Sequence, residues 1–124
     1  MPKRVFIAFA VEDEKYLTFL VGQAKLDKSP FEFVDMSVKE PWDEKWKTNC
    51  RTRVKGCDGL IALISKNTAK ADGELWEIQC AYDENVPVML MWINDERPAV
   101  PALLKGKLIS VWGWANLKKF IENL

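Results

Sequence analysis

The chain is organised around one stretch, residues 60–80, where an apolar run leads through a polar loop into a helix that begins with acidic residues. A strand that ends in a loop above a helix N-terminus is a usual binding edge of an α/β domain. We expect Glu77 to sit at this edge. The chain contains no histidine, which excludes Ser-His-Asp and Cys-His nucleophilic pairs and most catalytic zinc sites. Any chemistry therefore has to use carboxylates, hydroxyls, amides, lysines or thiols.

Length and composition predict a single domain, residues 1–124, with neither nucleic acid nor membrane as a partner. The chain has 124 residues, of which 48% are hydrophobic, enough for one core and too few for two. Eighteen basic and eighteen acidic residues cancel, so no net field attracts phosphate backbones or anionic lipid. No apolar run approaches the roughly 20 residues of a membrane span.

The three cysteines, Cys50, Cys57 and Cys80, show no CxxC spacing, and the chain opens without the apolar run that secretion needs. We therefore expect a cytoplasmic protein with reduced thiols. Cys50 and Cys80 occupy helical positions that face apolar neighbours, which predicts core thiols.

Strand and helix patterns alternate along the chain. We expect strands at residues 4–9, 31–35, 60–64, 86–93 and 107–111, and helices at residues 13–26, 43–55 and 116–123 besides the one that carries Glu77. This alternation predicts right-handed βαβ units and a parallel sheet. A chain of this size commonly forms a flavodoxin-like three-layer sandwich with about five strands in the order 2-1-3-4-5. Its crevice lies between the carboxyl ends of strands one and three.

Within the helix that carries Glu77, the apolar residues Leu75, Ile78 and Tyr82 repeat at i, i+3 and i+7 and predict the face turned to the core. Glu77 lies off that face, so it points either to solvent or into a cleft. Its simplest structural role is to interact with the N-terminal helix dipole, which is worth about 0.3–1 kcal/mol. Asp13 is similarly placed to cap the first helix.

Familiar ligand signatures of such folds are absent. The sequence has neither GxGxxG nor a Gly-Lys-Ser/Thr phosphate loop, and the loop after the first strand lacks glycine. A tightly bound nucleotide cofactor is therefore not expected, and no metal site is expected either. A phospho-accepting receiver domain would need an aspartate at the end of the third strand, where this chain has Ile64-Ser65-Lys66.

Four segments in order resemble the TIR-like domains, the Toll and interleukin receptor fold in its bacterial, Thoeris-type form. RVFIAFAVED, residues 4–13, resembles the first strand and loop of that family, with Phe9 and Asp13 matching its aromatic residue and aspartate. FEFVDMS, residues 31–37, is similar to the second strand and the loop that follows, with Asp35 and Ser37 in the expected places.

CDGLIALISKNT, residues 57–68, resembles the family's third strand and contains Ser65 and Asn67. ELWEIQCAYDENVPVMLM, residues 74–91, resembles the next helix and strand, with Glu77 matching the glutamate that enzymatic TIR domains use on NAD. The resemblance covers roughly residues 3–93. Two positions depart from it: Ala8 stands where the family often has serine, and Gly73 where it often has tryptophan.

The resemblance implies cleavage of NAD at the bond between nicotinamide and ribose, giving ADP-ribose or a cyclic isomer that signals in antiviral defence. Nicotinamide leaves as a neutral group, so one carboxylate without a histidine suits this chemistry. Glu77 is the expected catalytic residue. The expected substrate contacts are Phe9, Asp13, Asp35, Ser37, Ser65, Asn67 and Trp76. Such domains act through self-association or a partner protein.

Two further functions are compatible with the sequence. One is a non-catalytic interaction module on the same fold, in which residues 36–42 and the neighbouring helices bind a partner or a second copy. The other, weaker one is an enzyme similar to nucleoside deoxyribosyltransferases, which also place a glutamate near an anomeric carbon. Three observations distinguish these functions. Release of nicotinamide would indicate NAD cleavage, partner binding alone the interaction module, and base exchange on a deoxynucleoside the transferase.

Overall fold

Within the residues that the structure describes, five parallel strands form one sheet in the order β2-β1-β3-β4-β5. The computed structural model describes residues 3–26, 31–35 and 44–124, with side chains for residues 3–25 and 45–124. The strands are β1 (Lys3–Ala8), β2 (Phe31–Asp35), β3 (Gly59–Ile64), β4 (Val88–Trp92) and β5 (Ile109–Ser110). The predicted flavodoxin-like class and strand order are confirmed, and β5 is shorter than predicted.

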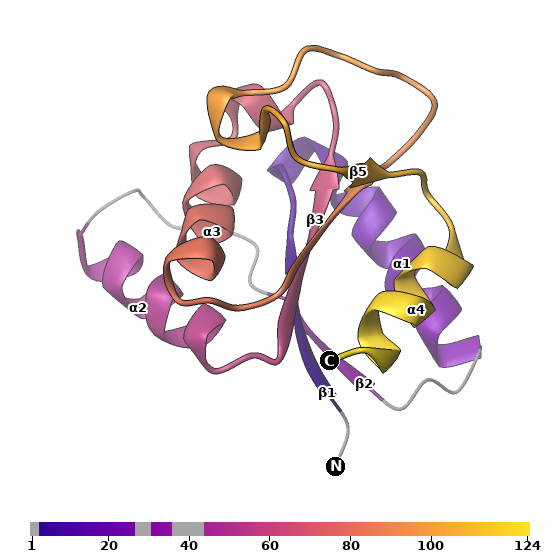
Figure 1. Ribbon diagram of the computed structural model, residues 1–124, viewed down its shortest axis with the longest axis horizontal. Coiled ribbons are helices and arrows are strands. Elements are labelled where there is room, and N and C mark those ends of the chain that lie inside the picture. Colours follow the sequence, from indigo (N-terminus) through magenta and orange to yellow (C-terminus); the bar gives the residue numbers. More distant parts are fainter. Residues whose placement is uncertain (1–2, 27–30, 36–43) are drawn as a thin grey trace.

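Helices cover both faces of this sheet. They are α1 (Glu14–Leu26), α2 (Glu44–Lys55), α3 (Asp72–Asp83) and α4 (Trp114–Glu122), with short 3-10 turns η1 (Val11–Asp13), η2 (Thr68–Lys70) and η3 (Ala102–Leu104). Figure 1 shows α2 and α3 on one face and α1 and α4 on the other, which gives the three layers. None of the helices in the described part of the chain has the length and apolar character needed to cross a membrane.

The core has two halves because consecutive side chains of a strand point to opposite faces of the sheet. In β3, Leu60, Ala62 and Ile64 pack under α2 and α3, whereas Ile61 and Leu63 pack under α1 and α4. All five are at most 1% exposed. Full burial of a leucine or isoleucine contributes about 1.5–3 kcal/mol to folding, so β3 is the central strand that fixes the positions of the loops at its ends.

Helix α3 turns a different face inward from the one that its apolar residues predict. The buried set is Glu74, Glu77, Ile78, Cys80 and Ala81, of which all but Cys80 are spaced i, i+3, i+4 and i+7, while Leu75 and Tyr82 are only partly buried. The prediction failed because the helix packs against α2 as well as the sheet (Figure 1), so a second face is covered. A hydrophobicity pattern cannot reveal carboxylates that are turned inward.

Candidate functional site

A crevice of about 280 Å³ lies at the carboxyl edge of the sheet, where β1, β3 and β4 end. It is lined by Glu12, Asp13, Lys15, Tyr16, Ser65, Lys66, Asn67, Ile93, Asn94 and Glu96. This is the switch point between β1 and β3 at which the sequence predicts ligand binding. Three of the expected contact residues, Asp13, Ser65 and Asn67, lie together there.

Asp13 connects the loop after β1 to the loop after β3. Its Oδ2 accepts a hydrogen bond of 2.5 Å from the Ser65 hydroxyl, and its Oδ1 accepts one of 2.9 Å from the Asn67 side-chain amide. The Asn67 backbone N–H donates in turn to Ser65 Oγ at 3.0 Å. Asp13 is 3% exposed. Its carboxylate therefore bridges two strands, a different role from the helix cap that the sequence indicates.

This network leaves acceptor positions unused. A carboxylate has about four acceptor positions, and the Asp13 side chain uses two of them on Ser65 and Asn67. Because Asp13 is 3% exposed, the remaining positions can accept hydrogen bonds from hydroxyls such as those of ribose only when the surrounding loops move. Lys15 and Lys66 also line the crevice and can attract phosphate, whereas Glu12 and Glu96 of the same lining repel it.

Glu77 is buried on α3 and 1% exposed, and it is not among the described residues that line the crevice. Its carboxylate lies near the thiols of Cys50 on α2 and Cys80 on α3. Burial raises the pKa of Cys80 to about 11, with Asp83 and Glu77 adding to the rise and Arg51 opposing it. Burial, followed by Glu77, raises the pKa of Cys50 further still. Both thiols therefore stay protonated at neutral pH and are poor nucleophiles.

A second carboxylate, Glu74, lies one helical turn before Glu77, and sequence reasoning missed it. Glu74 is 2% exposed, and neither of its carboxylate oxygens has a hydrogen-bond partner in the described structure. Burial raises its pKa well above the ordinary value; the nearby Thr68 side chain opposes the rise, and the charges of Asp13 and Glu12 add to it. The spacing i, i+3 to Glu77 is the signal that could have found it, since such residues share a helix face.

The two expected aromatic contacts, Phe9 and Trp76, pack within the fold. Phe9 is 5% exposed and packs in the core on the α1 and α4 side. Trp76 is partly buried between α3 and α2, where its indole N–H donates to the Lys47 carbonyl oxygen at 3.3 Å. The Lys47 Nζ and Arg51 Cζ atoms lie 5.3 and 5.2 Å from the centre of its ring. Trp76 therefore holds α2 against α3, and neither aromatic residue lines the crevice.

The remaining expected contacts belong to the second strand and its exit. Asp35 is the last residue of β2 and stands in register with Ile7 of β1, but its side chain lies outside the described part. Ser37 and the loop expected to make partner contacts lie outside the described residues altogether.

One family model and two solved structures are similar to this chain. A family model described as "Thoeris protein ThsB, TIR-like domain" matches residues 6–98. The crystal structure of the TIR domain of the Toll-related receptor TRR-2 from Hydra magnipapillata is similar with a TM-score of 0.74 at 16% identity, over 96% of this chain and 98% of that one.

The crystal structure of a prokaryotic SEFIR domain is similar with a TM-score of 0.55 at 13% identity, over 98% of this chain and 88% of that one. At these identities the two structures support the fold alone. No curated protein sequence matches the chain significantly. The family model spans most of the chain, including the crevice residues and α3, and the chain therefore belongs to the family of TIR-like domains of the Thoeris protein ThsB.

Proposed function

We propose that this protein cleaves NAD at the bond between nicotinamide and ribose, with Glu77 as the catalytic carboxylate, and that the product signals in antiviral defence. The proposal depends on the position of Glu77, which lies on the inward face of α3 in a domain of the ThsB family. Glu77 is the residue that matches the glutamate of enzymatic TIR domains. The Thoeris name of the family supports the defence role.

The reaction needs one carboxylate and no general acid. The bond between ribose C1′ and the nicotinamide nitrogen breaks, and its electron pair goes to that nitrogen, so the pyridinium charge disappears and nicotinamide leaves neutral. Positive charge develops on the ribose ring, where the Glu77 carboxylate stabilises it. Water then forms the new bond to C1′ and loses a proton, giving ADP-ribose. Attack by an atom of the same nucleotide gives a cyclic product instead.

The crevice residues are proposed to hold the rest of the substrate. Glu74 is electrostatically coupled to Asp13 and lies one turn before Glu77 on the same face of α3, so α3 leads from the crevice network to the catalytic residue. Asp13 would accept hydrogen bonds from ribose hydroxyls, while Asn67 and Lys66 would bind phosphate oxygens.

The burial of Glu77 implies that the resting domain is closed. At 1% exposure this carboxylate cannot contact NAD until α2 and α3 separate or move. We therefore expect activity to require self-association or a partner protein that stabilises the open arrangement, and to be low in dilute solution.

The direct test is chromatography of NAD incubated with the purified protein at high concentration, with and without a crowding agent. We expect nicotinamide release by the native chain and at least a hundredfold less from Glu77→Gln, because the main source of charge stabilisation is removed. Glu122→Gln is the matched control, since Glu122 is exposed on α4. Circular dichroism must show that both variants fold. Equal release by Glu77→Gln and the native chain would contradict the assignment.

The same burial favours a second function, a non-catalytic interaction module. A glutamate that is 1% exposed and does not line the crevice can serve packing alone. In that case the native chain releases no nicotinamide under any condition, NAD leaves the melting temperature unchanged, and the protein still binds a second copy or a partner.

A further inference from the structure

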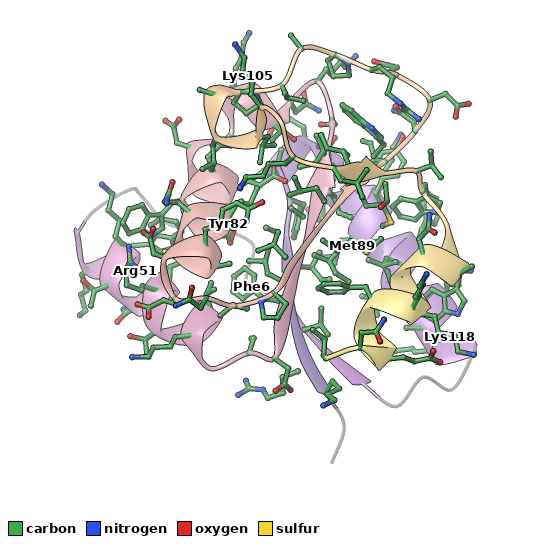
Figure 2. All side chains as sticks on the ribbon, in the orientation of Figure 1. Phe6, Arg51, Tyr82, Met89, Lys105 and Lys118 are labelled. Carbon is green, nitrogen blue, oxygen red and sulfur yellow. The ribbon has the colours of Figure 1, made fainter. Side chains whose placement is uncertain are left out.

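A second concave surface lies away from the crevice, between the C-terminal part of α3, the first half of β4, and α4. This groove has a volume of about 580 Å³. It is lined by Tyr82, Val88, Met89, Leu90, Lys107, Leu108, Ser110, Asn116, Lys119, Phe120 and Asn123. Figure 2 labels Tyr82 on its α3 side and Met89 on β4. None of these residues lines the crevice or belongs to the proposed catalytic set.

The groove exists because β5 is too short to cover β4. Strand β4 has five residues, but only Leu90 and Met91 pair with β5. The first residues of β4, Val88 and Met89, therefore form part of the groove wall on the side where a full-length strand would lie. The volume falls within the roughly 300–1,000 Å³ that is typical of small-molecule sites.

The charge of the groove selects anions. Lys107 and Lys119 are its only ionised lining residues in the described structure, and neither forms a salt bridge with a described carboxylate. The Lys107 Nζ lies 4.4 Å from the centre of the Tyr82 ring, so this cation is held over an aromatic wall of the groove. Because no described carboxylate lies within salt-bridge distance of this ammonium, it can bind a phosphate or carboxylate.

The rest of the lining suits a planar ring. Tyr82 and Phe120 supply aromatic surfaces and Met89 and Leu90 an apolar floor, while the Asn116 and Asn123 side-chain oxygens remain available because their amide nitrogens donate to Val111 and Lys119 carbonyl oxygens. An extended peptide fits less well, since the uncovered part of β4 spans two residues and offers too little edge for an added strand.

The geometry points to an anionic aromatic ligand in this groove, of the size and chemistry of a nucleoside monophosphate, bound through Lys107 and Lys119 and stacked against Phe120. The site is separate from the carboxyl-edge crevice. It would let a nucleotide influence α3, the helix that carries Glu77, from its opposite end.

Isothermal titration of the whole chain with AMP, adenosine and ribose 5-phosphate tests this assignment. We expect AMP to bind, and adenosine and ribose 5-phosphate to bind at least about tenfold more weakly, because each lacks one of the two recognised parts. The double variant Lys107→Gln/Lys119→Gln should weaken AMP binding by at least about tenfold. Asn116→Trp, which keeps every charge and fills the groove, should do the same.

The matched control is Lys105→Gln/Lys118→Gln. It removes the same charge from two exposed lysines that do not line the groove and that extend outward in Figure 2. This control should bind AMP like the native chain. Absence of AMP binding, or equal losses in the two lysine pairs, would overturn the assignment. Because AMP has no nicotinamide, the result does not depend on whether NAD is cleaved.

Discussion

The Ser65 hydroxyl and the Asp13 carboxylate, 52 positions apart in the sequence, are joined by a buried hydrogen bond of 2.5 Å. This contact links the exits of β3 and β1, which are neighbouring strands in the sheet. Because Asn67 donates to the other oxygen of the same carboxylate, one side chain fixes two loops. The Asp13 side chain therefore pre-organises the crevice.

Replacing Asp13 with alanine should destabilise the fold by about 2–3 kcal/mol, because the buried Ser65 hydroxyl and the Asn67 amide lose their acceptors. The measurement is the urea dependence of unfolding at pH 7. The control is Glu12→Ala, at an exposed neighbouring residue, which should change the free energy of unfolding by less than about 0.5 kcal/mol. Similar values for both variants would show that the network contributes nothing to stability.

Glu74 should make the stability of the protein fall as the pH rises. Burial raises its pKa well above the ordinary value of 4.5. At pH values between the unfolded-state and folded-state pKa, the folded state therefore holds a proton that the unfolded state has released. The stabilising protonated form is fully present below the unfolded-state pKa and is lost as the pH rises through the folded-state pKa. Glu74→Met removes this titration. It should be more stable than the native chain by on the order of 1–3 kcal/mol at pH 8.

The comparison between pH 5 and pH 8 isolates this effect. The advantage of Glu74→Met over the native chain should shrink at pH 5, where the native carboxyl is closer to full protonation in both states. Urea unfolding midpoints of both proteins at the two pH values measure this difference in stability. An advantage that is the same at both values would mean that the gain comes from apolar packing rather than from the buried carboxyl.

The fold could be predicted because its signals are local and repeated. The apolar run of β3 and the alternation of strand and helix patterns determine a parallel sheet, and the predicted order was confirmed. The positions of Asp13, Ser65 and Asn67 followed from topology, since parallel strands bring their carboxyl ends to one edge. The burial of Glu74 and Glu77 could not be read in this way. It depends on how α3 packs against both α2 and the sheet, and this is a long-range property.

The cysteines should be unreactive in the folded protein. Cys50, Cys57 and Cys80 are all buried, and burial raises the pKa of each thiol, so few thiolates exist at pH 8. We expect Ellman's reagent to modify none of them within minutes in native conditions and all three in denaturant. Rapid labelling of one thiol in the native chain would reveal local opening, and mass spectrometry of peptides would identify whether α2 or α3 opens.

Arg51 should control how readily α2 and α3 separate. Its guanidinium, on α2 (Figure 2), lies 3.3 Å from Asp83 and 3.5 Å from Glu84 at the end of α3, and it also lies over the Trp76 ring. Because these ion pairs are partly exposed, Arg51→Met should cost at most about 1 kcal/mol of stability. If separation of the two helices admits NAD to Glu77, the same variant should release nicotinamide several-fold faster than the native chain.

Lys55→Met is the control for this change, since Lys55 is an exposed cation of the same helix and takes part in neither of the described ion pairs with Asp83 and Glu84. It should leave the rate of nicotinamide release unchanged. The double variant Arg51→Met/Glu77→Gln should be inactive, because faster opening has no effect without the carboxylate. A rate for Arg51→Met that equals the native rate, with stability lowered as expected, would show that the α2 and α3 contact does not limit access. The opening would then have to occur elsewhere around Glu77.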